Sequence, residues 1–291
     1  MRVGVVGAGA MGMGVVQSAL RAGFATHVRD VRPEVHAQAT RHGATCHASA
    51  SALARACDAV VILVVDSAQV EDVLFASEGI AGSGARPVIF LGSTIAPQDA
   101  AAFAERLSHA GLAAIDAPVS GGPQRAADGS MTMMLAGPSD AIERCRGLLR
   151  AIAGKVFVLG TRPGDAAKFK IVNNMLAGAN LAAAGEAIAL AERAGLDPRL
   201  VHDVVAASSG ASWIFADRVP RALDGDYEPR AATRILCKDV GLAVDLANSV
   251  GVDAAMAKAA HAAFRAAVDE GFGESDDAAI VEWNRRRRGC P

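Results

Sequence analysis

Short apolar runs alternate with helical segments through the first half of the chain. Seven runs have the length and composition of buried strands: Val3–Val6, Ala25–Arg29, Val60–Val65, Val88–Leu91, Ala113–Ile115, Thr132–Ala136 and Val156–Leu159. The segments between them, such as Ser67–Leu74, have helical composition. Repeated strand–helix–strand units predict a mostly parallel, doubly wound α/β sheet. In such a sheet the ligand lies at the carboxyl ends of the strands.

The first predicted strand leads into a glycine motif with the spacing G-x-G-x-x-G. Gly7 permits a tight turn, Gly9 lets a pyrophosphate approach the backbone, and Gly12 allows close packing of helix on strand. Such a spacing alone also fits an ordinary glycine-rich turn. Here it lies between a strand and a helix, and Asp30 ends the second strand, where a ribose-binding carboxylate is expected. We therefore predict a Rossmann-type dinucleotide site, with phosphates on the helix N-terminus.

After Gly164 the strand pattern disappears, and the rest of the chain is predicted to be helical. Ala166–Ala194 contains no proline, and Gly195 is a suitable C-terminal stop. About 29 residues would make a helix of roughly 43 Å, long enough to join two domains. Its small residues predict that another helix packs tightly along it. Further helices should break at Gly210, Pro220, Gly225, Pro229 and Gly251.

The two patterns together predict two domains with a boundary near residue 162. Residues 1–162 would form an NAD-binding Rossmann domain, and residues 163–291 an all-helical domain for substrate binding and oligomerisation. The long helix would connect them.

Composition narrows the class of protein. Half of the residues are apolar and the net charge is −2, so no global charge attracts nucleic acid or an anionic membrane. The basic run Arg285–Arg288 fits a solvated tail better than a nucleic-acid patch. Five scattered cysteines, including Cys290, suggest reduced thiols in the cytoplasm and no structural metal. We expect no signal peptide and no membrane span.

The strand ends and the first turns of the long helix carry the candidate chemistry. Lys170 and Asn174 are four residues apart and share one helix face. A partly desolvated lysine loses its proton more readily, which suits proton exchange with a hydroxyl, and an amide could hold the same hydroxyl. An exposed helix surface is the alternative for this pair, and Lys168 is expected to be an ordinary solvated lysine. Ser120-Gly121-Gly122 could bind a carboxylate through backbone N–H groups, or could simply be a flexible turn.

These motifs resemble the β-hydroxyacid dehydrogenase family, which includes 3-hydroxyisobutyrate dehydrogenase and tartronate semialdehyde reductase. The matching pieces are Gly7-x-Gly9-x-Met11-Gly12, Asp116-Ala-Pro-Val-Ser-Gly-Gly122, Gly164-x5-Lys170-x3-Asn174 and Lys238-Asp239. They follow the family's order and cover essentially the whole chain. The resemblance implies Lys170 as catalytic acid/base, Asn174 and the Ser120–Gly122 segment as substrate-binding, and Thr94 and Lys238 near the nicotinamide.

Further segments resemble the L-threonate dehydrogenase branch of this family. They are Met11-Gly-Met-Gly14, Asp30-Val-Arg-Pro-Glu34, Ser212-Trp-Ile-Phe215, Arg218-Val-Pro220, Gly225-Asp-Tyr227 and Asp276-Asp277. The family often has Leu-Pro in place of Val64-Val65 and Gly in place of Ala166, so the resemblance leaves the substrate open. Trp213 and Phe215 are expected either to shape a substrate pocket or to be core aromatics.

The sequence therefore predicts an NAD-dependent dehydrogenase of a small hydroxy acid, with a four-carbon sugar acid favoured. The alternatives are 3-hydroxyisobutyrate oxidation, tartronate semialdehyde reduction, and a non-catalytic dinucleotide-binding protein. Asp30 favours NAD, but Arg29 and Arg32 flank it and could accommodate NADP. The expected assembly is a homodimer or homotetramer. The predicted cofactor-binding residues are Gly7, Ala8, Gly9, Ala10, Met11, Gly12, Asp30, Val64, Val65, Thr94 and Lys238.

Overall fold

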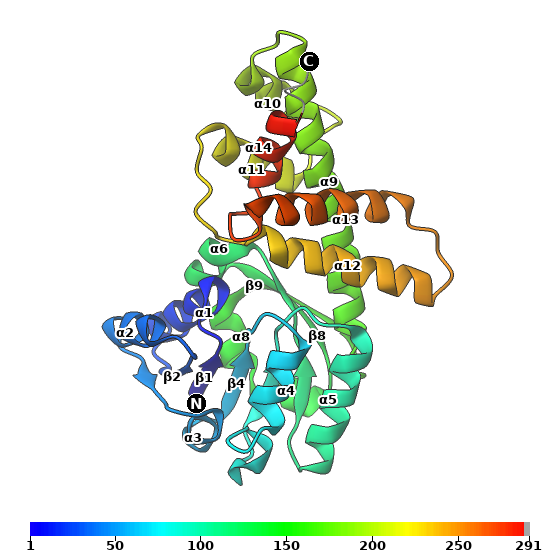
Figure 1. Cartoon of the computed structure of the whole chain (residues 1–291). Helices are drawn as coiled ribbons and strands as arrows, with labels where there is room; N and C mark the ends of the chain where they lie inside the picture. The colour runs from blue at the N-terminus through cyan, green and yellow to red at the C-terminus, as the bar shows by residue number, and fades with distance from the viewer. Residues whose placement is uncertain (288–291) are drawn as a thin grey trace. The chain divides into compact units, whose positions relative to one another are not determined.

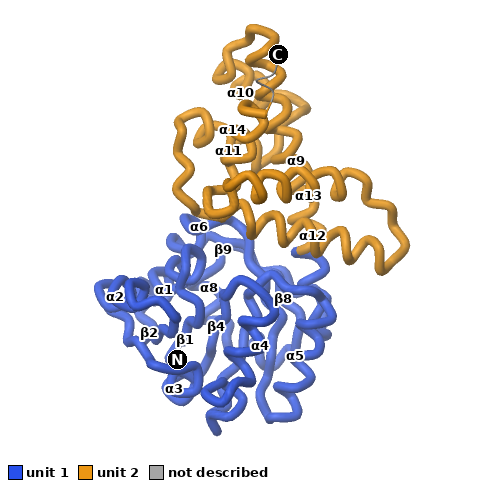
Figure 2. The backbone as a smooth tube through the Cα atoms, viewed as in Figure 1, with its two compact units in different colours: residues 1–170 blue, residues 171–291 orange. Residues whose placement is uncertain are grey.

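The structure is a computed structural model that describes residues 1–287. Its chain divides into two compact units, residues 1–170 and 171–291 (Figure 2). The first unit holds the strands and most of the shorter helices, and the second is helical (Figure 1). The division falls inside one long helix, α9 (Asp165–Arg193). Arg288 and Cys290 lie outside the described residues.

Nine strands form one sheet within the described part of the first unit. Their bounds are β1 Arg2–Val6, β2 Ala25–Arg29, β3 Thr45–Cys46, β4 Ala59–Ile62, β5 Val88–Leu91, β6 Ala114–Asp116, β7 Val119–Ser120, β8 Met131–Ala136 and β9 Ala153–Gly160. Strands β3-β2-β1-β4-β5-β6 are parallel neighbours in that order. Strands β6 and β7 both pair antiparallel with β8, and β9 pairs parallel with β8. The mostly parallel, doubly wound sheet is confirmed.

Helices cover both faces of this sheet because alternate residues of each buried strand point to opposite sides. Val5, Val61 and Phe90 belong to one core cluster, and Val6, Ile62 and Leu91 belong to the other. The first cluster includes side chains of α1 (Ala10–Arg21), α2 (Pro33–Arg41) and α8 (Arg146–Ile152). The second includes side chains of α3 (Ala50–Ala56), α4 (Ser67–Phe75) and α5 (Pro97–His109). The remaining elements of this unit are η1 (Ala81–Ser83), α6 (Gly122–Asp128) and α7 (Ser139–Arg144).

The second unit packs helices around the C-terminal part of α9. They are α10 Pro198–Ala206, α11 Trp213–Leu223, α12 Thr233–Ser249, α13 Ala255–Ala267, a π-helical turn at Val268–Phe272, and α14 Ala279–Arg287. A Cβ atom on Gly178 would lie 2.3 Å from Val240 Cγ2, and one on Gly185 would lie 2.6 Å from Asn284 Nδ2. The close packing predicted from the small residues of α9 is therefore confirmed, with α12 and α14 as the partners. Among the described residues no helix is both long and apolar enough to cross a bilayer.

The sequence predictions differ from the structure in several places, including β9, which begins at Ala153 and not at Val156. Strand β4 ends at Ile62, not at Val65, because Asp66 already caps α4 through Gln69 N–H at 2.9 Å. The two-residue strands β3 and β7 were not predicted, since two residues give no detectable periodicity. Pro220 does not break a helix, because α11 continues three residues beyond it. Arg285, Arg286 and Arg287 form the last turn of α14 and make ion pairs, so this run is helical, although Arg286 and Arg287 are solvent-exposed as expected.

Candidate active site

The glycine loop after β1 has the geometry that a bound dinucleotide requires. Gly7 has φ of +82°, and its N–H donates to the carbonyl of Arg29 at 3.0 Å. A Cβ atom on Gly12 would lie 2.1 Å from the carbonyl oxygen of Gly7, so the start of α1 lies directly against the turn. Gly9 is the N-cap of α1, and no side chain caps this helix. Its first N–H groups are therefore suited to hold the pyrophosphate of a dinucleotide.

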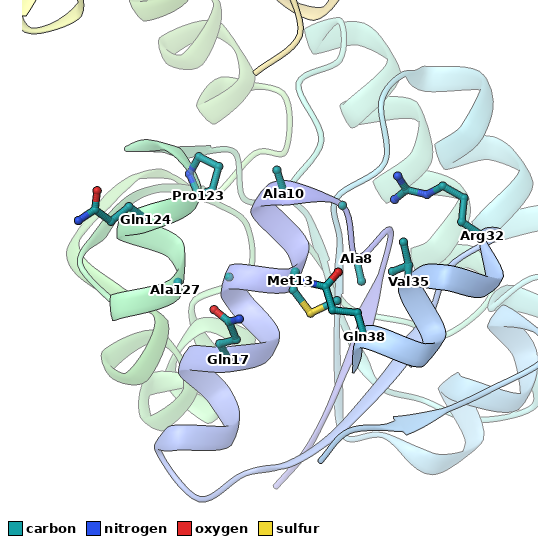
Figure 3. A pocket seen from close by; sticks show the side chains of 12 residues that line it. Ala8, Ala10, Met13, Gln17, Arg32, Val35, Gln38, Pro123, Gln124 and Ala127 are labelled. Carbon is teal, nitrogen blue, oxygen red and sulfur yellow. The ribbon is translucent and has the colours of Figure 1, made fainter. Parts of the chain in front are cut away.

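A pocket of about 430 Å³ lies beside this loop, between α1, α2 and α6 (Figure 3). Its lining residues are Ala8, Gly9, Ala10, Met13, Gly14, Gln17, Arg32, Val35, Gln38, Pro123, Gln124 and Ala127. The walls combine apolar side chains with three amides and one guanidinium, which suits the adenosine half of a dinucleotide. The residues of this unit thus fit an NAD(P) molecule.

Asp30 forms an ion pair with Arg32 at the edge of this pocket. Arg32 Nε lies 2.9 Å from Asp30 Oδ1, and Arg32 Nη2 lies 3.1 Å from Asp30 Oδ2. The carboxylate is 3% exposed, whereas the guanidinium side chain is 49% exposed. Burial opposes ionisation of Asp30, but hydrogen bonds from Arg32 and from the backbone of Ala8 outweigh it and lower the pKa of the carboxyl. The pocket therefore exposes the guanidinium of Arg32, whereas the carboxylate of Asp30 that pairs with it is buried.

The predicted site residues at the strand ends lie along one edge of the sheet. Val6, Ile62, Leu91 and Asp116 are register partners across four neighbouring parallel strands. Consequently the segments that follow them leave the sheet at the same edge, and these segments include Gly7, Val64, Val65 and Thr94.

The Ser120–Gly122 segment belongs to the same unit. Ser120 is the last residue of β7, Gly121 is the N-cap of α6, and Gly122 is its first residue. The φ angles of the two glycines are +127° and +76°. These angles require glycine at both positions. Helix α6 packs against α1, because a Cβ atom on Gly14 would lie 2.6 Å from Ala126 Cβ. The glycine loop and the Ser120–Gly122 segment are thus followed by two helices in direct contact.

Helix α9 carries both Lys170 and Asn174. The side chains are buried, with Lys170 9% and Asn174 7% exposed, although both are polar. Lys168, two residues earlier, is exposed and pairs with Asp165 at 2.9 Å. The alternative of an exposed helix face therefore describes Lys168 but not Lys170.

Asn174 is oriented by residues of the second unit. Its Nδ2 donates to Asp239 Oδ2 at 2.7 Å, and its Oδ1 accepts from Asn173 Nδ2 at 3.1 Å. Lys238 Nζ lies 2.7 Å from the other carboxylate oxygen of Asp239. Since an ionised carboxylate only accepts hydrogen bonds, the carbonyl end of the Asn174 amide must point away from Asp239.

Trp213 and Phe215 have different environments. Phe215 is 4% exposed, stacks on the His202 ring, and belongs to the core of the helical unit. Trp213 is 51% exposed, and the Arg218 guanidinium lies 5.8 Å from its ring centre. Trp213 therefore has surface available for a ligand, whereas Phe215 mainly supports the core.

Two buried carboxylates were not predicted as functional from the sequence. Asp116 lies at the end of an otherwise apolar strand and Asp239 lies in α12; both belong to motifs of the family resemblance, which gave neither of them a role. A charged residue that ends a buried strand was the available signal for Asp116. Nothing in the spacing indicated Asp239, because its partner Asn174 is 65 residues away. In residues 1–287 no group of three or more His, Cys, Asp or Glu side chains could hold a metal ion.

Comparison with known proteins covers nearly the whole chain. Residues 2–160 match the NAD-binding domain model of 6-phosphogluconate dehydrogenase, and residues 164–284 match the model for NAD-binding of NADP-dependent 3-hydroxyisobutyrate dehydrogenase. L-threonate dehydrogenase of Cupriavidus necator is 45% identical over 282 residues, which are 96% of this chain and 95% of that protein. L-threonate dehydrogenase of Escherichia coli strain K12 is 41% identical over 284 residues, 96% and 93% of the two chains.

One solved structure also matches nearly the whole chain. It is a crystal structure of 3-hydroxyisobutyrate dehydrogenase from Salmonella typhimurium, with a TM-score of 0.92 and 41% identity. The match covers 97% of this chain and 99% of that one.

Proposed function

Because this chain belongs to the β-hydroxyacid dehydrogenase family, which includes 3-hydroxyisobutyrate dehydrogenase, we propose that it oxidises a four-carbon sugar acid of the L-threonate type. The chain is an NAD(P)-dependent dehydrogenase that acts on a CH–OH group of a small hydroxy acid. The observation that carries the proposal is the pair of buried polar side chains, Lys170 and Asn174, on one helix of a chain so similar to L-threonate dehydrogenases.

Lys170 is assigned the acid/base role. Its amine accepts the proton of the substrate hydroxyl during oxidation and returns it during reduction. When bound, the nicotinamide supplies the acceptor for the hydride that leaves the same carbon. Asn174 presents its amide oxygen to a substrate hydroxyl, because Asp239 occupies its N–H₂ end. Proton exchange and orientation of the hydroxyl are thus assigned to neighbouring turns of one helix.

The substrate carboxylate is assigned to Ser120-Gly121-Gly122. The Ser120 hydroxyl can donate a hydrogen bond, and glycines with positive φ leave backbone N–H groups unobstructed by side chains. Trp213 is assigned to the wall of the pocket for the remaining hydroxyls, with Phe215 supporting it from the core. Thr94 and Lys238 are assigned to the nicotinamide end of the cofactor. The boundary between the NAD-binding and the helical domain is assigned to residue 162, which lies between the two segments that match family models.

NAD is the favoured cofactor. Gly7 to Gly12 would hold the pyrophosphate, and Asp30 would accept from the ribose hydroxyls. Val64 and Val65 would lie along the nucleotide. The exposed Arg32 guanidinium is the feature that supports the alternative, NADP, because it could pair with a 2′-phosphate.

A cytoplasmic homodimer or homotetramer is the proposed assembly. Val172 and Leu176 are 50% and 56% exposed and lie four residues apart on α9, a pattern that suits burial against a second copy. The four described cysteines are free thiols, as expected in a reducing compartment. Sedimentation analysis with a Leu176→Glu variant tests the assembly, because a charge at an interface should shift it toward monomer.

The substrate is tested by a panel of hydroxy acids with NAD and with NADP. The panel contains L-threonate, D-threonate, 3-hydroxyisobutyrate, tartronate semialdehyde in the reverse direction, and the methyl ester of L-threonate. We expect the highest kcat/KM for L-threonate and a large loss for the ester, which lacks the carboxylate charge. A higher kcat/KM for 3-hydroxyisobutyrate, or equal rates for ester and acid, would contradict the proposal.

A further inference from the structure

Asp116 is a buried carboxylate in the candidate active site to which the proposed function assigns no role. It is the last residue of β6 and only 2% exposed. Its backbone is held between two strands, with Leu91 of β5 on one side and Ala136 of β8 on the other. The carboxylate therefore projects from a rigid point of the sheet, four residues before Ser120.

The partners of this carboxylate are at the start of α9. Asp116 Oδ2 accepts from the backbone N–H of Gly164 at 2.8 Å and from that of Ala167 at 2.9 Å. Gly164 precedes the helix, and its carbonyl accepts from Lys168 N–H at 3.3 Å, as an N-cap residue does. The N–H of Ala167 is one of the orphan donors of the first helical turn.

Helix α9 cannot supply this cap itself. Gly164 has φ of +98°, and a Cβ atom there would lie 2.6 Å from the carbonyl oxygen of Pro97. Any residue with a capping side chain would therefore be strained and would clash with the backbone. The carboxylate of Asp116, 48 residues earlier in the chain, takes the place of that missing side chain. Its charge also complements the positive end of the helix dipole.

We propose that Asp116 is a positioning residue, which holds the first turn of α9 on the end of β6 and so places Lys170 relative to the Ser120–Gly122 segment. The proposal rests on the proposed function, because it takes Lys170 as the acid/base. Lys170 follows Ala167 by three residues, about one helical turn, so a shift of the capped turn moves its amine. The end of β6, which leads to Ser120–Gly122, thereby also fixes the start of α9, which carries Lys170.

The environment of Asp116 supports a specific interaction. Burial opposes ionisation and raises the pKa of Asp116 to about 6, although the N–H groups of Ala167, Gly164 and Ala166 favour the charged form. Burial of a carboxylate is costly unless it is hydrogen-bonded, and Asp116 meets this condition through the N–H groups of α9.

The test compares Asp116→Ala, Asp116→Asn and Asp140→Ala in the full-length protein. Asp140 is an exposed acidic residue in the first turn of α7, so its removal controls for the loss of one carboxylate at a helix start. Amide hydrogen exchange of residues 164–170 and steady-state kinetics are measured for each variant. Asp116→Ala should raise exchange at these amides at least tenfold and lower kcat about 10–100-fold, with KM for NAD unchanged.

Asp116→Asn keeps an oxygen for the same two N–H groups, so it should recover most of the exchange protection and lose less than tenfold in kcat. Asp140→Ala should match the wild type in both. Unchanged kcat in Asp116→Ala, or reduced kcat with unchanged exchange at residues 164–170, would overturn the proposal. Exchange does not depend on which lysine is catalytic, so full activity of a Lys170→Ala variant would overturn the proposed function separately.

Discussion

The side-chain amide of Asn174 donates to the carboxylate of Asp239 across 2.7 Å, and both side chains are buried. Asn174 alone could face a ligand with either its oxygen or its N–H₂ group. The carboxylate removes that freedom, since it cannot accept from a carbonyl oxygen. An amide oxygen presented in this way binds hydroxyl groups and repels carboxylates, which agrees with the assignment of the substrate carboxylate to another segment.

Substitution of Asp239 by asparagine should allow the Asn174 amide to rotate. A buried hydrogen bond to a charged group contributes about 1.5–3 kcal/mol, so kcat/KM for the hydroxy acid should fall roughly 10–100-fold. The dissociation constant of NAD should change little, if Lys238 keeps its position. Asp245→Asn, an exposed carboxylate of the same helix, is the matched control. Retention of full kcat/KM by Asp239→Asn would show that this hydrogen bond does not orient Asn174 for the substrate.

Replacement of Lys170 by alanine should remove the proton acceptor. Positioned acid–base catalysis contributes about 10²–10⁴-fold, and kcat should fall by at least that factor. NAD affinity, measured by calorimetry, should barely change, because Gly7 to Gly12 and Asp30 are untouched. Lys168→Ala is the control, since this lysine is exposed and pairs with Asp165. Loss of turnover in Lys168→Ala with activity kept in Lys170→Ala would exchange the roles of the two lysines.

Cofactor preference should depend on the Asp30–Arg32 pair. We expect kcat/KM to favour NAD over NADP, because Asp30 would repel a 2′-phosphate by roughly 1–3 kcal/mol. Arg32→Ala should then increase the preference for NAD, since it removes the exposed cation of the pocket. Asp30→Ser should move the preference toward NADP. Wild-type preference for NADP would mean that Arg32 determines the choice.

The buried pair Arg218–Asp277 should be a major contributor to the stability of the helical unit. Arg218 Nε lies 2.5 Å from Asp277 Oδ1, and the two side chains are 10% and 4% exposed. Removal of Arg218 leaves a buried carboxylate without its partner, so Arg218→Ala should lower the free energy of unfolding by about 3–5 kcal/mol. Arg234→Ala breaks an exposed pair with Glu274 and should cost less than about 1 kcal/mol. Urea denaturation of the three proteins measures the difference.

Asp116 should make stability depend on pH. In the folded protein its pKa is about 6, raised by burial, compared with 3.8 for the ordinary group. Folding therefore favours the protonated carboxyl, and the stability from this group is complete below about pH 4 and lost as the pH rises through 6. The free energy of unfolding of Asp116→Asn relative to the wild type should rise by up to about 3 kcal/mol between pH 4 and 7. A constant difference across this range would show that Asp116 does not titrate there.

Much of the fold followed from patterns that are local in the sequence. Five of the predicted strands agree with the structure to within one residue at each end, because each is a short apolar run bounded by turn residues. Helix α9 begins one residue before its predicted start and ends at Arg193, with Gly195 in the left-handed conformation as its C-terminal stop. Pro220 was misleading because α11 continues to Leu223 despite the backbone hydrogen bond that this proline cannot donate.

The long-range polar contacts of the site and of the helical unit could not be predicted in the same way. Asp116 and Gly164 are 48 residues apart, Asn174 and Asp239 are 65 apart, and Arg218 and Asp277 are 59 apart. Each pair is brought together by the packing of whole helices and strands, for which no single stretch carries a signal. The resemblance to a family pointed to Lys170 and Asn174, but only the structure shows that Asp239 holds the amide of Asn174.

Helix α9 runs without interruption from Asp165 to Arg193, so Lys170 and Asn174 are separated by a fixed number of backbone hydrogen bonds. One residue inserted between them would rotate every later side chain of the helix by about 100°. Lys170 would then leave the helix face that carries Asn174, because Asn174, Gly178 and Gly185 keep their partners within the second unit. The side chains of residues 171–173 can therefore change without moving Lys170 relative to Asn174, but the length of this segment must stay constant for the two to share one helix face.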